Sequence, residues 1–203
     1  MSFTVELERG VRTLVRRDPV IRDLKRQHGL PTFRPHGKYF TTLVRSILSQ
    51  QISGSAAKTI IGRVSDVVGT LNDPRLLSEV PDDLLRSCGV SSQKLGYLRS
   101  LSEHVIEGKL KLRSLSRMSD DEIITALTDV KGIGVWTGKM FLMFSLGRLN
   151  VLPYEDLGVR KGAMIAYNLD QMPGKAELES IAHEFRWEPY LSIASWYMWR
   201  ATE

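Results

Sequence analysis

The chain has 203 residues, 42% of them hydrophobic, so it can bury one sizeable core or two smaller ones and is not a disordered chain. Its formal net charge of +5 favours a polyanionic partner. The single cysteine, Cys88, excludes an internal disulfide, a Cys-only zinc site and a four-cysteine iron–sulfur cluster. No apolar run is long enough to cross a membrane and the N-terminus lacks signal-peptide features, so we expect an intracellular protein.

Apolar residues recur at helical spacing along most of the chain. Glycine- and proline-containing breaks separate these segments, as in the loop of residues 29–37. The longest alternating, strand-like pattern is the short charged stretch from Lys109 to Leu115. The predicted fold class is therefore all-α. The expected helices span about residues 3–15, 19–24, 39–49, 55–68, 82–88, 93–106, 119–131, 134–146, 156–169, 178–185 and 193–198.

A helix–hairpin–helix is predicted near residues 119–147. Ser119 and Glu122 form a capping-box pattern at its start, and the turn Gly132-Ile133-Gly134 separates its two helices. Glycines allow the backbone positive φ and close approach to a partner, and free N–H groups at a helix start suit a phosphate. The alternative is an ordinary helical corner with a glycine C-cap.

A second pattern follows, in which a proline-marked loop leads to an acid. The run from Leu152 to Gly162 places Asp156 at a helix N-terminus, where the helix dipole favours the ionised carboxylate. The alternative is that Asp156 serves simply as an N-cap.

Taken together, three motifs resemble the helix–hairpin–helix superfamily of DNA glycosylases, and within it the 3-methyladenine DNA glycosylase II group. They are Gly132–Gly138 (GIGVWTG), the proline followed by Asp156–Gly162, and Leu48–Ser53 (LSQQIS) far upstream. The resemblance extends from about His36 to Arg200.

The resemblance implies two helical lobes with a cleft between them. The terminal lobe would comprise residues 1–38 plus 151–203, and the central lobe residues 39–150. Asp156 would lie at the mouth of the cleft. Relatives that are longer carry an additional N-terminal β domain, for which this chain has no room.

The implied activity is that of a monofunctional DNA glycosylase, which hydrolyses the N-glycosidic bond of an alkylated purine. A carboxylate beside C1′, implied to be Asp156, stabilises positive charge on the sugar and orients water. Because 3-methyladenine already carries a formal charge, it leaves without a second carboxyl. Relatives with lyase activity have a lysine nucleophile where this chain has Trp136. No lyase activity is therefore expected, although Lys139 is an amine one turn further on.

The resemblance also implies roles for side chains that contact DNA. Gln51 would fill the gap left by an extruded nucleotide, since its long, flat side chain can stack there and bond the orphaned base. Lys131, Lys139 and the N–H groups of Gly132 and Gly134 would contact phosphates.

A base pocket is expected from aromatic and soft side chains, which attract cationic bases through cation–π contact. The candidates are Trp136, Met140, Tyr154 and Trp187. For Trp136 and Met140 the competing interpretation is an ordinary place in the core. Family members often carry Arg-Ser where this chain has Leu191 and Ser192. The chain therefore departs from the family pattern at this end of the pocket.

The expected partner is double-stranded DNA containing damaged bases, bound by a monomer in the cytoplasm, nucleoid or nucleus. No cofactor and no catalytic metal are expected, apart from a structural monovalent cation held by hairpin carbonyls. Two alternatives remain. The same fold acts on deaminated or oxidised bases, or the protein is a non-catalytic DNA binder, for which a carboxylate at position 156 would only weaken binding.

Overall fold

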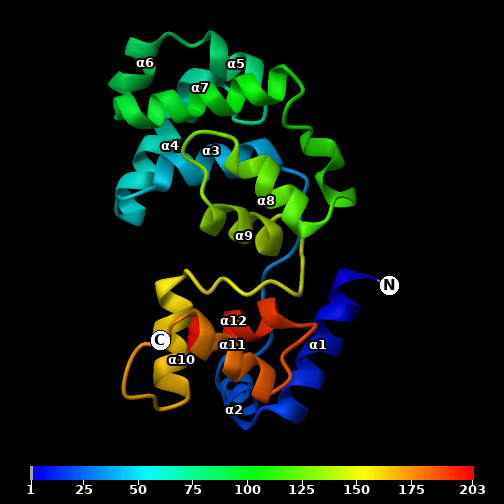
Figure 1. Ribbon diagram of the computed structural model, residues 1–203. Coiled ribbons are helices and arrows are strands. Elements are labelled where there is room, and N and C mark those ends of the chain that lie inside the picture. Colours follow the sequence, from blue (N-terminus) through cyan, green and yellow to red (C-terminus); the bar gives the residue numbers. More distant parts are fainter. Residues whose placement is uncertain (1) are drawn as a thin grey trace. The chain divides into compact units, whose positions relative to one another are not determined.

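The computed structural model describes residues 2–203, and within them the chain is helical with no strand (Figure 1), which confirms the all-α class. Across the same residues no helix combines the length and apolar character needed to cross a membrane. The elements are α1 Phe3–Arg17, α2 Pro19–His28, α3 Tyr39–Ser49, α4 Gly54–Val68, α5 Pro74–Glu79, α6 Asp82–Ser87, α7 Ser92–Ile106, the 3-10 helix η1 Leu112–Arg117, α8 Asp120–Thr128, α9 Val135–Phe144, α10 Leu157–Ala166, α11 Lys175–Glu184 and α12 Leu191–Arg200.

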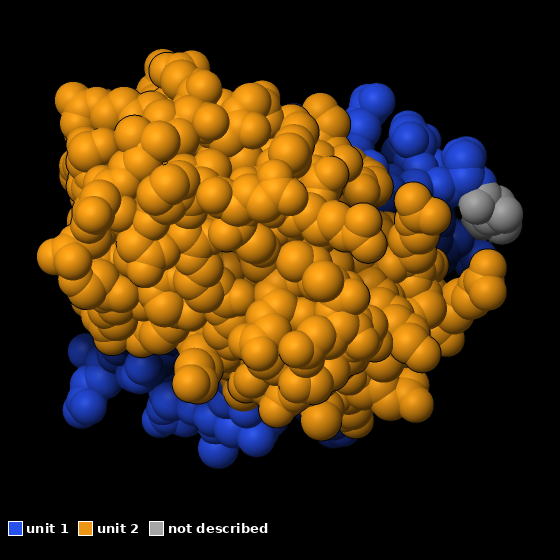
Figure 2. Space-filling view, turned by 90° about the horizontal axis from the view of Figure 1, so that it is seen from above, with its two compact units in different colours: residues 1–35, 142–203 blue, residues 36–141 orange. Residues whose placement is uncertain are grey.

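The chain divides into two compact units, coloured separately in Figure 2. Unit 1 joins Met1–Pro35 to Leu142–Glu203, and unit 2 is His36–Phe141. Residues 142–150 therefore belong with the termini, whereas the sequence interpretation had placed them in the central lobe. The reason is a set of bonds to α12: the Ser192 hydroxyl donates to the Arg148 carbonyl at 2.7 Å, and its backbone N–H donates to the Leu149 carbonyl at 2.9 Å.

Helix α12 is the centre of unit 1. Every residue from Leu191 to Met198 is buried, and the helix packs against α1, α2 and α10. A helix that is apolar nearly all round finds no solvent face, so its neighbours must enclose it. Its internal serine Ser195 donates to the Leu191 carbonyl at 2.8 Å, which satisfies the hydroxyl within the core.

A buried carboxylate ties the N-terminal helices to the C-terminal segment in unit 1. Asp18 is fully buried and caps α2, with its Oδ1 accepting from the N–H groups of Val20 at 2.8 Å and Ile21 at 3.2 Å. Its Oδ2 accepts from the Tyr167 hydroxyl at 2.5 Å and the Trp187 indole at 2.8 Å. Burial, with Asp18 beside it, raises the pKa of Tyr167, so the phenol stays protonated and donates.

In unit 2, α7 packs against α3, α5 and α6. Leu98 and Leu101 are fully buried on its inner face, as are Leu43 and Ile47 of α3. On another side of α7, Arg99 donates to the carbonyls of residues 77, 78 and 80 and pairs with the Asp82 carboxylate at 2.6 Å. One guanidinium thus fixes the connection from α5 to α6.

Two short elements were not among the expected helices. The stretch at residues 109–115, which carries the longest alternating pattern, forms no strand, as the all-α prediction requires: Leu110 and Leu115 are buried there and η1 begins at Leu112. Helix α5 was not predicted, although Asp73 caps it and Pro74 begins it, the combination that starts many helices. Its six residues are too few for a recognisable apolar period.

Replacing Asp18 by Ala tests how much the buried carboxylate stabilises unit 1. The cap itself contributes about 1 kcal/mol, and each buried donor left without an acceptor adds about 1–3 kcal/mol, so we expect a loss of about 3 kcal/mol or more. Asp73→Ala is the matched control, because it also removes an Asp cap before a proline. It breaks only one side-chain hydrogen bond, which is exposed to solvent. Circular dichroism during urea unfolding measures both. Equal losses in the two variants would contradict the role given to the buried bonds.

Candidate functional site

Asp156 caps α10 and is held from two directions. Its Oδ1 accepts from the Val159 backbone N–H at 2.9 Å and from the Trp199 indole N–H at 2.8 Å. The first bond is local to the helix end, whereas the second comes from α12. The side chain is half-buried. A carboxylate with this support has a fixed direction, which a mobile surface acid lacks.

Two glycines of α10 make the indole contact possible. A Cβ at position 162 would lie 1.7 Å from the Met198 carbonyl oxygen, so α10 and α12 touch through backbone. A Cβ at position 158 would lie 2.8 Å from Cδ1 of Trp199 and 3.1 Å from Oδ1 of Asp156. The spacing of four residues places both glycines on one face of α10. The glycines of the Asp156–Gly162 run therefore let α12 approach close enough for Trp199 to reach the carboxylate.

The predicted hairpin is present in unit 2, between α8 and α9. The capping box is confirmed: the Ser119 N–H donates to a Glu122 carboxylate oxygen at 2.7 Å, and the Glu122 N–H donates to the Ser119 hydroxyl at 3.3 Å. Gly132 adopts φ of 84°, which favours glycine, and a Cβ there would lie 2.2 Å from Cδ2 of Tyr97. The ring of Tyr97 therefore packs directly on the hairpin backbone.

The loop after α3 is bonded to this hairpin. The Gln50 side-chain amide donates to the Gly132 carbonyl at 2.8 Å, while Gln51 is exposed and has φ of 55°, a left-handed conformation that is uncommon outside glycine. The Lys94 ammonium donates to the Leu48 carbonyl at 2.7 Å, and partial burial lowers the pKa of Lys94. Gln50 thus holds the loop to the hairpin, and the exposed Gln51 extends from it.

The hairpin residues predicted to contact phosphate differ in exposure. Lys131 and Gly134 are exposed and Gly132 is partly so. Lys139 is 8% exposed, and a solvated phosphate requires an accessible ammonium. Helix α9 is nearly all apolar and turns that position inward. The structure therefore contradicts the assignment of Lys139 to phosphate, whereas Lys131 and the two glycines stay predictions.

The predicted pocket residues are not all available to a ligand. Trp136 is 44% exposed at the start of α9, and Met140, one turn later on the same face, is half-buried. Trp187 is fully buried and its indole N–H donates to Asp18. The prediction that Trp187 lines the base pocket is therefore wrong. The Trp-Glu-Pro-Tyr pattern indicated a loop, but in the structure the Trp187 indole is bonded within the core to Asp18, the N-cap of α2.

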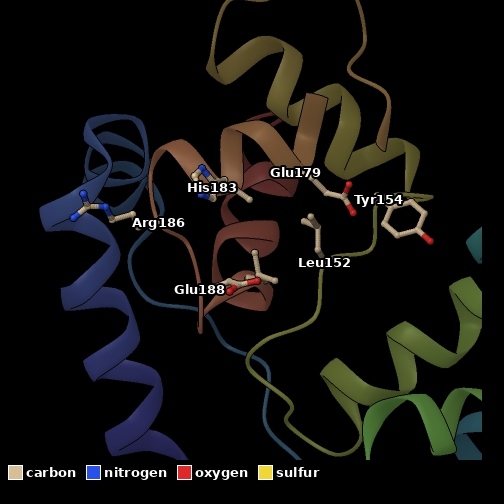
Figure 3. A pocket seen from close by; sticks show the side chains of 8 residues that line it. Leu152, Tyr154, Glu179, His183, Arg186 and Glu188 are labelled. Atoms are coloured by element: carbon tan, nitrogen blue, oxygen red, sulfur yellow. The ribbon is translucent and has the colours of Figure 1, made fainter. Parts of the chain in front are cut away.

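Tyr154 lines a pocket in unit 1, of about 750 Å³ (Figure 3). The Lys175 ammonium lies 4.5 Å from the centre of the Tyr154 ring, so one face already holds a cation of the protein. Asp156 is not among the lining residues, so we do not assign this pocket to chemistry at that carboxylate. Its walls are Leu152, Tyr154, Glu179, Ala182, His183, Arg186, Glu188 and Leu191.

Sequence reasoning missed Trp199. It lies 43 residues from its partner Asp156, and the local pattern of α12 shows only that it is apolar. Its ring also packs on Phe144, with centroids 5.7 Å apart. Within residues 2–203 no group of three or more His, Cys, Asp and Glu side chains is placed to hold a metal ion.

Comparison with known proteins places these features in a family. Residues 44–187 match the family described as HhH-GPD superfamily base excision DNA repair protein. The DNA-3-methyladenine glycosylase 1 of Schizosaccharomyces pombe is 32% identical over 167 residues, which are 81% of this chain and 72% of the relative. A putative DNA-3-methyladenine glycosylase of Bacillus subtilis is 34% identical over 171 residues, covering 81% of this chain and 59% of that protein.

Solved structures agree in fold. The DNA-3-methyladenine glycosidase of Bacillus halodurans matches with a TM-score of 0.85 and 38% identity, over 95% of this chain and 88% of that one. The 3-methyladenine DNA glycosylase of Schizosaccharomyces pombe, solved in complex with abasic DNA, matches with a TM-score of 0.80 and 29% identity, over 94% and 95%.

Gly162→Ala and Gly158→Ala should separate backbone contact from side-chain contact. A methyl group at 162 meets a backbone carbonyl that cannot move alone, so we expect a loss at or above the usual 1–3 kcal/mol for overpacking. At 158 the indole can shift, so the loss is smaller but the bond to Asp156 breaks. Gly96→Ala in α7 is the control, since a Cβ there meets nothing within 4 Å. Thermal unfolding checks the order, and a Gly162→Ala variant as stable as Gly96→Ala would contradict it.

Proposed function

The chain belongs to the HhH-GPD superfamily of base excision DNA repair proteins, and we propose that it is a monofunctional DNA glycosylase that hydrolyses the N-glycosidic bond of alkylated purines of the 3-methyladenine type in duplex DNA. The observation that carries the proposal is the Asp156 carboxylate, fixed by the Val159 and Trp199 N–H groups. The names of the relatives supply the substrate class.

In the proposed reaction, Asp156 acts on the sugar and not on the base. As the bond from C1′ to the purine nitrogen breaks, its electron pair leaves with the base, and positive charge develops on the sugar. The carboxylate stabilises that charge and orients or deprotonates the water that attacks C1′. An alkylated purine is already cationic, so it departs as a neutral base without a protonated second carboxyl. One carboxylate is sufficient.

The support around Asp156 suits this role. Both N–H donors bond the same oxygen, Oδ1, and therefore set the direction of the whole carboxylate. A group that is already oriented need not reorganise when charge develops. Trp199, which supplies one of the donors, is a positioning residue in this proposal. Trp136 stands where a Schiff-base lysine would be needed, so the proposed product is an abasic site in an unbroken strand.

The hairpin and the loop after α3 form the proposed DNA-binding part of unit 2. The N–H groups of Gly132 and Gly134, with Lys131, would hold phosphate, and Gln51 would enter the gap left by the extruded nucleotide. Gln50 bonds the Gly132 carbonyl, so the two functions share one rigid support. The enzyme would act as a monomer on damaged duplex DNA inside the cell.

We also propose that the hairpin carbonyls hold a monovalent cation and that no other cofactor is required. Neutral backbone oxygens are the donors that hard cations accept, and the Val130 carbonyl, which accepts from the Ile133 N–H at 3.1 Å, retains a second lone pair. The carbonyls of residues 130–133 would hold the ion. Bound there, it would add positive charge beside a phosphate and would take no part in bond cleavage.

Asp156→Asn should abolish base release without disturbing the fold. The amide oxygen of Asn still accepts from Val159 and Trp199, but the negative charge is lost, so we expect a fall in rate of at least about 10²–10³-fold. Affinity for duplex DNA should stay equal or improve, because a negative charge is removed. Release of 3-methyladenine from alkylated duplex under single-turnover conditions measures the rate, and Glu155→Gln is the control that should keep it. A near wild-type rate in Asp156→Asn would refute the assignment.

Gln51→Ala should weaken binding to abasic-site duplex more than to intact duplex, because only the former contains a gap to fill. Gln50→Glu keeps the size of its side chain but has no N–H to donate to Gly132, so it should weaken binding to both duplexes. Fluorescence anisotropy on matched oligonucleotides gives both affinities. An equal loss on both duplexes for Gln51→Ala would argue against the plug.

A further inference from the structure

The net positive charge of this protein is concentrated at its N-terminal end. Residues 1–38 contain nine Lys and Arg against four Asp and Glu, so the rest of the chain contains nineteen of each. One of the four acids, Asp18, is fully buried and bonded to four donors. The net charge of +5 is thus equal to the charge of this segment alone.

Much of this charge lines one groove in unit 1, between α1 and α2. The groove has a volume of about 510 Å³. Half of its lining residues are cationic and one is acidic, and the others are apolar. The lining residues are Glu8, Val11, Arg12, Val15, Arg22, Lys25, Arg26 and Leu30. We call this the α1–α2 groove.

Neighbouring acids neutralise the groove only weakly. Arg12 pairs with Glu8 at 3.7 Å and Arg26 with Asp23 at 2.9 Å, but all four side chains are at least 45% exposed. Exposed pairs of this kind contribute little and exchange readily for another anion. In the part of the chain that the structure describes, neither Arg22 nor Lys25 is paired with an acid within 4.0 Å.

Helix stability does not account for the arrangement. Lys25 and Arg26 lie in the last turn of α2, where cations interact favourably with the helix dipole. Arg22, however, is the fourth residue of α2, nearer its positive end, and Arg12 lies in the middle of α1. Neither position gains from the dipole. Four cations from two helices that converge on one groove indicate an anionic ligand with more than one charge.

We propose that the α1–α2 groove binds the phosphate backbone of duplex DNA, as a contact surface separate from the hairpin. This rests on the proposed function in that the substrate is DNA. Arginine and lysine are the usual phosphate ligands, and such contacts add affinity without reading sequence. The one acid among its lining residues, Glu8, is paired with Arg12 at 3.7 Å. The groove lies on different helices from Asp156, so it would hold DNA and take no part in base release.

The experiment is a salt titration of binding to intact duplex of about 30 base pairs. The test variant is Arg22→Gln with Lys25→Gln, and the matched control is Arg75→Gln with Arg86→Gln, two exposed cations of unit 2. Each lost phosphate contact reduces the steepness of log K against log salt by about 0.9, so the steepness should fall by about 1.8 in the test variant. With affinities that converge near 1 M salt, this slope change corresponds to binding about 60-fold weaker at 0.1 M salt. Arg22→Lys with Lys25→Arg keeps both charges and should retain the wild-type slope.

The outcomes are distinct from those that test the glycosylase itself. At saturating DNA the test variant should release the base at the wild-type rate, because neither residue belongs to the Asp156 site. An unchanged slope, or an equal fall in the control pair, would overturn the proposal. Retained DNA binding with lost binding to vesicles that contain anionic lipid would assign the groove to a membrane surface and would also overturn it. If wild-type protein released no base, the proposed function would fail while the salt slopes still decided the groove.

Discussion

The close contact of α10 and α12 is the constraint on which the proposed catalytic site in unit 1 depends. At Gly162 the helices meet through backbone, with the Met198 carbonyl in the place of a side chain. Because α12 is buried from Leu191 to Met198, it cannot move away to admit a larger residue. The next residue, Trp199, thereby comes within 2.8 Å of the Asp156 carboxylate. A packing requirement in the core thus determines the direction of the one acid that the proposed chemistry needs.

Unit 2 uses the same principle at its hairpin. Gly132 has a backbone conformation that favours glycine, and the ring of Tyr97 occupies the space of a Cβ. Gln50 then joins the loop after α3 to this backbone. In both units a glycine admits a large side chain or backbone from a distant segment, and a polar side chain is bonded close to that contact. Rigid elements therefore support each candidate site, although its polar residues lie on loops and helix ends.

Local signals in the sequence were sufficient for part of this arrangement. The Ser119–Glu122 capping box and the Asp156 cap each depend on residues at most three positions away, so spacing alone predicted them. Trp199 was missed and Trp187 misassigned because the partners of both, Asp156 and Asp18, lie far away in sequence. Helical spacing indicates that a tryptophan lies on an apolar face, but it does not predict which carboxylate accepts a hydrogen bond from its indole N–H. Lys139 was misjudged for a related reason, since a charge on an otherwise apolar helix is no evidence of exposure.

The charge distribution gives a further reason why DNA binding and base release would use different parts of the protein. The segment that carries Asp156, residues 151–203, contains eight Asp and Glu against five Lys and Arg, so its field opposes a polyanion. Cations packed around a carboxylate keep it ionised, but they offset the negative field with which it stabilises positive charge on the sugar. The attraction to phosphate must therefore come from elsewhere, and residues 1–38 supply the whole net positive charge. Seven of the nine cations of this segment lie on α1 and α2, so the proposed α1–α2 groove would hold DNA while the Asp156 site remains acidic.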